Sequence, residues 1–441
     1  MSNPRDSRVF EALDSAVKGS ILQPGSKEYE TENGSYFSAF ENEVQPSYIV
    51  KPSNTNQVQD LFRALRPYIL SGGCQVAIRG GGHTPFAGSA NIQDGVTIDM
   101  RALKGINLSQ DRSVVEIGVG ETWATVYGEL EKHGLTVAGA RSGRIGVAGF
   151  ILGEGLSMFS PRIGFSCDSV VEGFEHGIVT SFKMSTFKST DIWGGITFYM
   201  SSNMVDTFSR LIHNACDFGR NEKDLDAYVY HTQGKENPPS LQRFTSLDDQ
   251  IKEMCTMRKS THLGFAEELS KFSSDGKRQY WASITIKPDV PLMEAFHKKW
   301  QDMIAIIRDV SGLTFSFGYH PLTKAMLESS AGAGGNAIAI PPLDGPLFVV
   351  LVNPGWNLPK DDSRVFKTVG NFVADLRKLA TDNGLLHRYI FANYAYQKDD
   401  CISGYGQESI IKLAETSKKY DPEGIFQKGV PGGFKLPIVE I

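Results

Sequence analysis

Short apolar runs alternate with stretches of helical periodicity through the first half of the chain. Val58, Leu61, Phe62 and Leu65 recur every three or four positions, as on the buried face of a helix. The strands predicted here are residues 47–50, 75–79, 96–100 and 114–119. The helices predicted are residues 9–17, 55 or 56 to about 69, and 122 to about 133. This mixed order contains no repeat and indicates helices packed on short β-branched strands.

The pattern changes at about Trp193, where longer amphipathic stretches begin. The helices predicted there are residues 208–218, 247–257, 292–310 and 363–382, and the strands are residues 279–286, 314–319 and 347–352. These elements predict a second, α+β domain. Residues 407–420 predict a last helix, and the tail after it must dock because Phe426, Val430 and Phe434 would otherwise face water. Residues 1–43 are polar and predict a short helix followed by an irregular arm.

Composition places the chain among globular proteins and excludes several partners. Its 441 residues suffice for two or three domains of about 150 residues. A net charge of −5 offers no basic footprint for nucleic acid or an anionic membrane. No secretory signal and no apolar run of about 18 residues is visible, so we expect a cytoplasmic protein that does not contact membranes. The five cysteines are scattered without a CxxC pair, which favours a reducing compartment and no metal site.

Residues 79–91, RGGGHTPFAGSAN, follow a predicted strand and hold the first candidate chemistry. Three consecutive glycines leave backbone N–H groups free to turn toward an anion, and His83 follows them directly. One interpretation is a phosphate cradle with an adaptable imidazole beside it. The other is a glycine-rich turn that the histidine merely caps.

A second glycine-dense stretch covers residues 139–164, GARSGRIGVAGFILGEGLSMFSPRIG. Glycines separated by apolar residues indicate backbone packed closely against a flat object or against another backbone. Two such stretches in one predicted domain favour a flat ligand. No G-x-G-x-x-G stands between a strand and a helix with an acidic residue following, which excludes Rossmann-type NAD binding.

Five motifs occur in an order and spacing that resemble one family. They are PSYIVKPSNTNQVQ, RGGGHTPFAGSANIQDGVTIDM, GVGETWATVYGELEKHGL, GRIGVAGFILGEGLSMFSPRIGFSCDSVV and YDPEGIFQKGVPGGFKL. From about Val44 to the end, the chain resembles the FAD-linked oxidoreductases of the vanillyl-alcohol-oxidase/PCMH type, specifically the fungal berberine-bridge-enzyme-like branch. The resemblance implies an α+β, two-domain flavoprotein fold: a flavin domain in two subdomains and an α+β substrate domain. We therefore expect an arm (1–43), a PCMH-type FAD-binding domain (44–190), a substrate domain (191–390) and a C-terminal segment returning to the flavin domain (391–441).

The resemblance also implies which residues bind FAD. The loop from Arg79 to Gly82 would wrap the pyrophosphate with backbone donors, and His83 would be bonded covalently to the flavin 8α-methyl carbon. Ser142 stands near the position where some relatives add a cysteinyl bond, so a second bond is not expected. Val147 matches a position where a small residue leaves space for oxygen, although it could simply pack. The full set of implied cofactor-binding residues is Arg79, Gly80, Gly81, Gly82, His83, Thr84, Gly88, Gly146, Val147, Gly149, Gly153, Gly155, Ile178 and Asn393; no metal is expected.

Tyr394, within IFANY, resembles the tyrosine that acts as general base in berberine-bridge-like oxidases, beside Asn393. An ordinary tyrosine has a pKa of about 10 and is a poor base at neutral pH, so a nearby cation is required. The sequence does not identify that cation, and a tyrosine that only packs its ring stays an alternative. His387 and Arg388 lie close in sequence, but exposed charge is their default interpretation.

The implied function is an FAD-dependent oxidoreductase that abstracts hydride from a small or medium organic substrate. Oxygen is the expected acceptor, secondary-metabolite biosynthesis the expected context and a monomer the expected state, while relatives are often secreted. One alternative is a degenerate flavoprotein-like binding protein without catalysis. Another is an oxidative cyclase, which closes a ring after oxidation.

The chain departs from the family at two places. After Val171 the family continues through a strand, a helix and a GGxxNFGIVT loop, whereas here residues 172–175 run directly into His176 and Gly177. A few dozen residues are missing, which we expect to leave unpaired ladder groups and an uncovered apolar face. An incorrect exon or a decayed gene explains this better than a competent shortened enzyme. Glu154 replaces a glycine beside the flavin, where its carboxylate would need solvent or a cation, or would point away.

Overall fold

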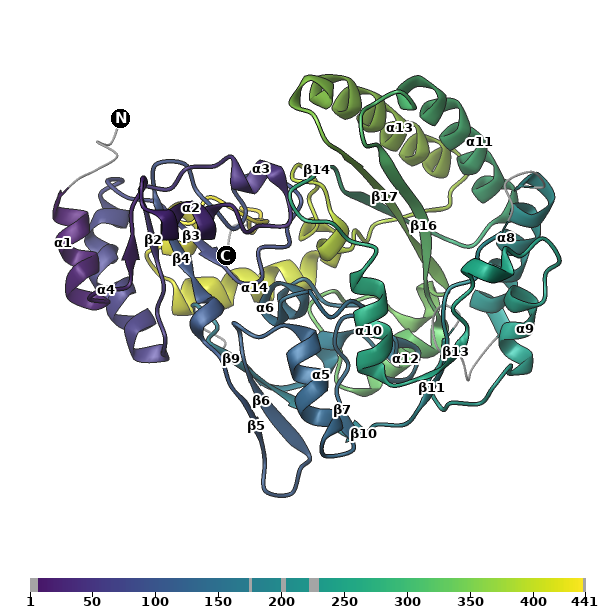
Figure 1. Cartoon of the computed structure of the whole chain (residues 1–441), viewed down its shortest axis with the longest axis horizontal. Coiled ribbons are helices and arrows are strands. Elements are labelled where there is room, and N and C mark those ends of the chain that lie inside the picture. Colours follow the sequence, from purple (N-terminus) through teal and green to yellow (C-terminus); the bar gives the residue numbers. More distant parts are fainter. Residues whose placement is uncertain (1–6, 174–176, 200–203, 222–229, 439–441) are drawn as a thin grey trace.

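The structure is a computed structural model that describes residues 7–173, 177–199, 204–221 and 230–438. The purple and blue part of the chain lies together with the yellow C-terminal segment on one side, and the green and teal part lies beside them (Figure 1). The first sheet has the order β1 (Ile21–Leu22), β2 (Tyr48–Val50), β4 (Val96–Asp99) and β3 (Val76–Arg79). Strands β2 and β3 both run parallel to β4, so a crossover connects β2 to β3. That crossover is α4 (Thr55–Leu70), whose N-cap is Asn54 rather than Thr55 or Asn56, since its side chain accepts the Gln57 N–H.

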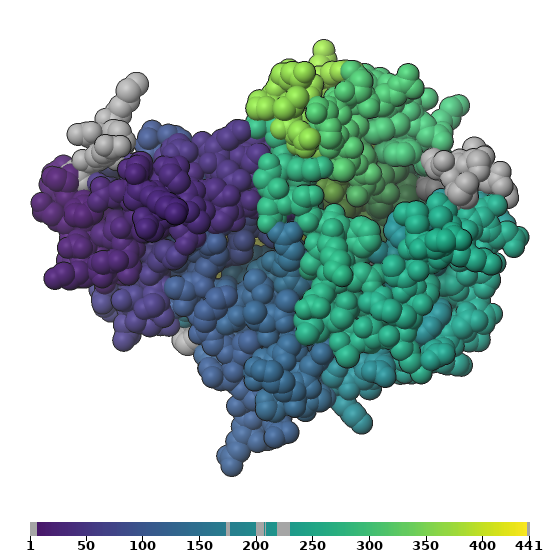
Figure 2. Space-filling view, in the orientation of Figure 1, coloured from purple at the N-terminus to yellow at the C-terminus, as the bar shows by residue number. Residues whose placement is uncertain are grey.

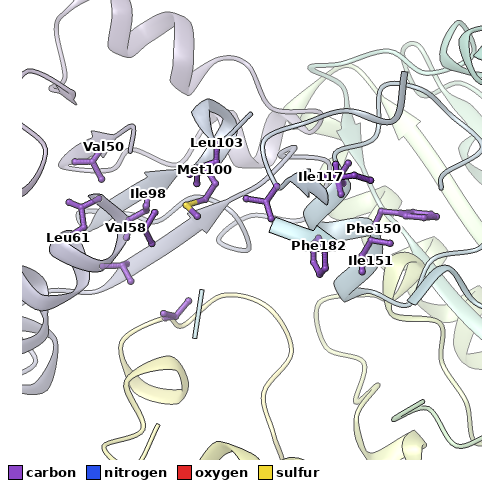
Figure 3. Close-up of a cluster of buried hydrophobic side chains, with 14 of the residues drawn as sticks. Val50, Val58, Leu61, Ile98, Met100, Leu103, Ile117, Phe150, Ile151 and Phe182 are labelled. Carbon is purple, nitrogen blue, oxygen red and sulfur yellow. The ribbon is translucent and has the colours of Figure 1, made fainter. Parts of the chain in front are cut away.

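A second, antiparallel sheet has the order β5 (Ile106–Leu108), β6 (Val114–Gly118), β9 (Ser181–Ser185) and β8 (Val170–Gly173). Helix α5 (Trp123–Glu131) buries Trp123 and Tyr127 completely. The two sheets share one core, which runs from Val50 and Leu61 through Met100 to Ile117 and Phe150 (Figure 3). Each such side chain contributes about 1.5–3 kcal/mol when fully buried. The first glycine stretch connects β3 to β4 within the first sheet, and the second lies between β7 (Leu135–Thr136) and β8 of the second sheet.

The shortened segment falls between β8 and β9, and its join at residues 174–176 lies outside the described residues. Its flanks pair directly, with Glu172 opposite Lys183 and Gly173 opposite Phe182. Strand β9 therefore pairs on both sides, with β6 and β8, whereas β8 is the edge strand of this sheet within the described residues. The pairing is irregular, with a register shift between Val170 and Glu172. Val171 is 54 % exposed, which agrees with the expected uncovered apolar surface.

The substrate half is built on a sheet with the order β14 (Arg278–Gln279), β17 (Leu347–Trp356), β15 (Ala282–Ile286) and β18 (Leu386–His387), and β16 (Thr314–Leu322) pairs with β17. Helices α11 (Val290–Ile307) and α13 (Asp362–Asp382) pack together over this sheet (Figure 1). A separate core supports them, including Phe296, Val350 and Leu376. The single predicted strand 279–286 is interrupted at residues 280–281, where the chain turns Trp281 out of the ladder.

The C-terminal segment docks on the first half, as predicted. After α14 (Gln407–Tyr420) and α15 (Ile425–Lys428), the Val76 N–H donates to Gly429 O at 2.8 Å. The Phe426 ring lies 5.5 Å from that of Phe62, and Val430 joins the first core. The apolar residues of the tail therefore do cover the flavin-binding half.

Two predictions of local structure are wrong. Residues 247–257 form no α-helix but only a short 3-10 turn, η4 (Lys252–Met254), because their backbone pairs with the preceding segment: Ile251 N–H donates to Phe198 O, and Thr256 N–H to Ile196 O. The arm is not irregular after its first helix, α1 (Ser7–Ala16). It contains α2 (Lys27–Asn33) and α3 (Ala39–Asn42), each begun by a serine N-cap.

The remaining elements are short connections or lie in the substrate half. The strands are β7 (Leu135–Thr136), β10 (Phe187–Lys188), β11 (Ile192–Gly194), β12 (Tyr230–His231) and β13 (Arg258–Ser260). The α-helices are α6 (Val147–Leu152), α7 (Ser160–Ile163), α8 (Met204–Asn221), α9 (Pro239–Thr245), α10 (His262–Ser270) and α12 (Lys324–Gly332). The other 3-10 helices are η1 (Met100–Ala102), η2 (Ser166–Ser169), η5 (Pro342–Asp344), η6 (Pro359–Asp361), η7 (Ala392–Tyr394) and η8 (Ser403–Tyr405).

Candidate functional site

The two glycine stretches touch each other directly. A Cβ on Gly81 would lie 2.7 Å from Gly146 Cα, and one on Gly146 would lie 2.5 Å from Gly81 Cα. Real Cβ atoms are not found this close to backbone, so both positions require glycine. A Cβ on Gly80 would meet that of Ala148 at 3.1 Å. The sequence predicted that these glycines pack against either a flat object or another backbone. The structure shows backbone here, because each stretch packs on the backbone of the other.

The side chain of Arg79 faces the N-terminal segment. Its guanidinium donates to Glu32 O at 2.8 Å and to Ser35 O at 2.7 Å, and it stacks over the Tyr36 ring. Gly82 has φ = 67°, and a Cβ there would lie 2.9 Å from the Tyr36 ring. A contribution of Arg79 to a pyrophosphate site must therefore come from its backbone, as predicted.

His83 stacks on Phe37, with ring centroids 4.3 Å apart. Burial lowers the pKa of the imidazole to about 4; the charge of Asp275 opposes this shift, and that of Arg144 adds to it. Its Nε2 is buried and has no hydrogen-bond partner among the described residues. A neutral imidazole with an unused ring nitrogen is the chemical form that a bond to flavin requires.

Gly88 belongs to a different contact. The Gly88, Ser89 and Ala90 N–H groups donate to the buried carboxylate of Glu41 at 2.7–3.0 Å. Burial raises the pKa of Glu41 to about 7 although the three donors favour its charged form. The amide of Gly88 is thus taken by protein, and its predicted role in cofactor binding is restricted to its left-handed backbone at φ = 82°.

The second glycine stretch forms α6, with Gly146 as its N-cap. Val147 is completely buried in the first core, so its side chain packs, which was the alternative to lining a space for oxygen. Gly149 faces outward, and a Cβ there would meet nothing within 4 Å. This helix therefore presents bare backbone on the side opposite its buried valine.

The end of α6 is fastened to the C-terminal segment by Asn393. Its amide Nδ2 donates to Gly149 O at 3.0 Å, and its Oδ1 accepts the Gly155 N–H at 3.2 Å. A Cβ on Gly153 would lie 2.1 Å from Asn393 Nδ2. Gly155 has φ = 74°, and a Cβ there would lie 2.7 Å from Phe150 and from Ser166. Four of the predicted cofactor residues, Gly149, Gly153, Gly155 and Asn393, are thereby brought together.

Tyr394 has the cation that its predicted role requires. The guanidinium of Arg141 donates to Tyr394 Oη and, through its other nitrogen, contacts His320 Nδ1 at 3.3 Å. Burial and the charge of Arg141 both hold the pKa of His320 well below its usual range, so this imidazole is neutral. Sequence reasoning missed Arg141, although it is a charged residue inside the second glycine-dense stretch and next to Ser142. No motif marked His320 as a site residue, although most of its strand was predicted as residues 314–319.

A chain of rings connects His83 with Tyr394. The ring of Phe37 lies edge-on to Trp281 at 6.1 Å, and Trp281 lies 5.4 Å from Tyr394. The indole Nε1 of Trp281 is buried without a hydrogen-bond partner in the described ranges. Phe37 comes from the arm and Trp281 from the break between β14 and β15, so neither could be assigned to the site from its local sequence.

Other predicted positions lie at the edges of this region. Thr84 is half-buried in the irregular loop after His83, and Ile178 packs against the first core. Ser142 Oγ lies 3.2 Å from Ser270 Oγ. His387 is not an exposed charge, because it is half-buried and lies 3.1 Å from Asp344. Arg388 is exposed but donates to Ala339 O and Gly404 O.

The surface is hollowed where the purple, blue and green parts of the chain meet, and yellow C-terminal residues are visible inside (Figure 2). A separate cavity of about 570 Å³ lies between α8 and α9, away from both glycine stretches. In the described ranges, no three His, Cys, Asp or Glu side chains are grouped to hold a metal. No helix in those ranges has the length and apolarity needed to cross a bilayer.

Residues 46–173 match the model of an FAD binding domain, and this range includes both glycine stretches. The chain is an FAD-linked oxidoreductase. Its fold resembles 6-hydroxy-D-nicotine oxidase from Arthrobacter nicotinovorans (TM-score 0.74, 16 % identity, 96 % of this chain and 98 % of that one). It also resembles Physcomitrella patens BBE-like 1 (TM-score 0.75, 17 % identity, 98 % and 100 % covered).

Relatives of this oxidoreductase occur in fungi. FAD-dependent monooxygenase tpcD of Cochliobolus heterostrophus is 28 % identical, with 91 % of this chain and 87 % of that protein covered. FAD-dependent monooxygenase CTB5 of Cercospora beticola is 26 % identical, with 95 % and 90 % covered. These alignments extend over 457 and 479 positions, more than the 441 residues of this chain. The relatives therefore contain segments that have no counterpart here.

FAD fits the residues of the oxidoreductase. The unused Nε2 of His83 is available for a bond, and α6 is open at Gly149, where a Cβ would meet nothing within 4 Å. Tyr394 is placed at the other end of the same aromatic chain. His83, Gly149 and the loop before His83 would hold the cofactor, while Arg141 and Tyr394 would face the substrate.

Proposed function

We propose that this oxidoreductase oxidises a small or medium organic substrate and that Tyr394 is the group that accepts the substrate's proton. The observation that carries the proposal is the hydrogen bond from the Arg141 guanidinium to Tyr394 Oη. The guanidinium donates to the oxygen that the substrate's proton would reach, and so holds this phenol in one orientation. Arginine stays charged at all relevant pH values, so this contact persists.

Arg141 is itself oriented by a second contact. His320 Nδ1 faces one of its nitrogens, and the imidazole stays neutral because burial disfavours its charged form. A protonated histidine would repel the guanidinium. The pair therefore directs the positive charge of Arg141 to Tyr394 and keeps the phenol in one orientation.

FAD, held by His83 and the loop before it, would supply the hydride-accepting chemistry of this oxidation, with dioxygen as the final acceptor of the two electrons and two protons. His83 would tether the cofactor, and the oxidised substrate would leave with one C–H bond and one X–H bond fewer. The oxidase behaviour and the covalent tether are parts of this proposal. A role in secondary-metabolite biosynthesis and a monomeric state stay predictions.

Three variants test the assignment. Purified protein is denatured with acid, and a yellow pellet is expected for the wild type and a colourless one for His83→Ala. Anaerobic mixing with a panel of alcohols, amines and phenols is then followed at the flavin absorption band. We expect Tyr394→Phe to retain the flavin but to slow bleaching about 10²–10⁴-fold, the usual contribution of a general base. Arg141→Gln should also slow bleaching, because it removes the cation that contacts Tyr394 Oη.

Unchanged bleaching in Tyr394→Phe would remove the tyrosine from the mechanism. Arg141→Lys is the matched control, because it keeps the charge and loses the planar fork. An intermediate rate in that variant is expected if charge beside the phenol is the main contribution.

The fate of oxygen separates an oxidase from the activity named in the fungal relatives, which are called monooxygenases. Under ¹⁸O₂, an oxidase releases labelled peroxide and an unlabelled product. A monooxygenase places one labelled atom in the product. Recovery of label in the product would replace the oxidase part of the proposal.

A ligand-binding protein without catalysis is the second candidate. One observation favours it: the relatives carry segments that this chain lacks. Sequencing the transcript across residues 171–177 would show whether a longer message encodes a GGxxNFG segment. Protein that retains flavin but is not reduced by any member of the panel would support this second function.

A further inference from the structure

A buried carboxyl group lies where the second glycine stretch meets the C-terminal segment. Glu154 is 4 % exposed and has φ = 82°, a left-handed conformation that residues with a Cβ rarely adopt. Strain of this kind persists where surrounding contacts hold the residue in place. The carboxyl of Glu154 makes such contacts. Its partners are two phenol hydroxyls and a backbone N–H, rather than the solvent or cation expected from the sequence.

The partners of this carboxyl come from both sides of Tyr394 in the sequence. Oε1 accepts a hydrogen bond from Tyr405 Oη at 2.6 Å, and Oε2 accepts one from Tyr389 Oη. The Ala392 N–H is also bonded to it. One side chain of the flavin-binding half therefore gathers three points of the segment that carries the proposed base.

Apolar packing closes the cluster from water. Leu156, Phe165, Tyr389 and Phe391 belong to one buried group, against which Tyr394 and Tyr405 pack. In such surroundings each hydrogen bond is stronger, and each unsatisfied polar group is more costly, than at the surface. Loss of the carboxyl would leave two buried phenols without their acceptor.

We propose that Glu154 is a positioning residue that clamps the segment 389–405 onto the flavin-binding half and so holds Tyr394 against Arg141. This inference rests on the proposed role of Tyr394. Asn393 provides a parallel attachment to Gly149 and Gly155, but it fixes only the residue next to the base. Glu154 fixes the segment on both flanks.

The strength of this clamp depends on whether the carboxyl of Glu154 is protonated. The titratable groups around Glu154 are Tyr389, Tyr405, Cys167 and Cys401, which are all neutral at pH 7 because burial raises their pKa values. Burial likewise raises the pKa of Glu154 to about 8. A neutral carboxyl still accepts from and donates to phenols, whereas a charged one brings a buried charge into an apolar cluster. The clamp therefore weakens as the pH rises through about 8.

Hydrogen exchange of the flavin-loaded protein, followed by mass spectrometry of peptides, tests this directly. In Glu154→Gly the amides of residues 389–405 should exchange about tenfold to a hundredfold faster than in the wild type, the effect of losing buried hydrogen bonds. In Glu154→Gln, which cannot ionise, protection at pH 7 should be kept. The wild type should lose protection between pH 7 and 9 relative to this variant, with both compared at the same pH.

Two controls separate the clamp from general stability. Peptides of α13 should exchange equally in all variants, because this helix lies in the other core. Glu121→Gln removes another buried carboxylate, one that accepts the Gly105 N–H, and it should leave residues 389–405 with the wild-type pH dependence. Protection of these residues in Glu154→Gly, or equal pH dependence in the wild type and Glu154→Gln, would overturn the proposal.

Tyr394→Phe distinguishes this inference from the proposed function. It should abolish rapid flavin reduction but leave residues 389–405 protected. Suppose that Glu154→Gly loosens the segment while the flavin of Tyr394→Phe is still bleached at the wild-type rate. Glu154 is then a clamp, but Tyr394 is not the base. The positioning role would be lost together with the proposed function.

Discussion

The two glycine stretches are each held to a terminal segment by one buried carboxyl group, but the partners of the two carboxyls differ in kind. Glu41 reaches from the arm into the first stretch and accepts three backbone N–H groups. Glu154 reaches from the second stretch and accepts two phenol hydroxyls. Backbone amides can only donate, whereas phenols can donate or accept. The three partners of the first carboxyl therefore offer no acceptor for a proton on it, whereas the phenols of the second contact can accept one.

The two contacts also differ in whether they hold the segment that carries the proposed base. The arm fastens the loop that follows the expected tether His83, and the three amides in that contact lie outside the segment that carries the proposed base. The C-terminal contact fastens the segment that carries Tyr394. A change of pH near 8 is expected to reach the base through Glu154 and to leave the first stretch in place.

The largest expected effect comes from the place where the two stretches touch. Gly81→Ala would put a Cβ 2.7 Å from Gly146 Cα, and backbone on both sides cannot move away cheaply. We expect a loss of about 4 kcal/mol or more in the free energy of unfolding, or insoluble protein. Denaturant unfolding at pH 7 measures it.

Gly149→Ala is the matched control for this substitution, since a Cβ there meets nothing within 4 Å and alanine favours a helix by about 1 kcal/mol. It should be as stable as the wild type or slightly more so. If flavin lies against this backbone, the variant should bind less of it. A fully stable Gly81→Ala would contradict the direct contact between the stretches.

The next effect depends on pH and separates the two carboxyls. Burial raises the pKa of Glu154 from an ordinary 4.5 to about 8, so the folded protein holds this proton more tightly than the unfolded chain does. The stabilisation is complete below pH 4.5, decreases as the pH rises and is lost above about 8. Because each pKa unit corresponds to about 1.4 kcal/mol, the whole change is a few kcal/mol.

Glu154→Gln should remove that dependence. We expect the variant to be at least as stable as the wild type at pH 9 and similar to it near pH 5, measured by thermal unfolding over the series. Parallel curves for the two proteins would show that the carboxyl does not titrate in this range.

Glu41→Gln should behave in the opposite way. Its new amide NH₂ would face backbone N–H groups that cannot accept, which leaves at least one buried donor unsatisfied and costs about 1–3 kcal/mol. Because burial also raises the pKa of Glu41, to about 7, the wild type loses some of its own stability between about pH 4.5 and 7, so the loss in the variant should be largest near pH 5 and smaller at pH 9. If Glu41→Gln is as stable as the wild type at both pH values, the contrast between the two contacts is wrong.

Sequence patterns predicted the parts of this protein whose determinants are local. Glycine spacing placed both stretches, and periodicity placed α4, α11 and α13 close to their observed bounds. The candidate site was predicted only at the residues that carry motifs. Arg141, Phe37 and Trp281 reach it from three separate segments, so their roles depend on tertiary placement that no local pattern records. The predicted helix 247–257 failed for the same reason, because pairing with residues 196–198 outweighed its periodicity.

The smallest effect concerns a single hydroxyl at the first contact. Tyr36 Oη donates to Ala90 O at 3.2 Å, next to the amides that Glu41 holds. Burial raises the pKa of Tyr36 above its usual range, so this hydroxyl stays protonated across the accessible pH range. Tyr36→Phe should therefore lower the free energy of unfolding by about 1 kcal/mol, the net value of one hydrogen bond, and by the same amount at pH 6 and pH 9. Tyr405→Phe at the second contact should have a loss that grows with pH, because its hydroxyl donates to a carboxyl that becomes charged. Equal pH dependence of the two phenylalanine variants would mean that the two contacts respond to protons alike.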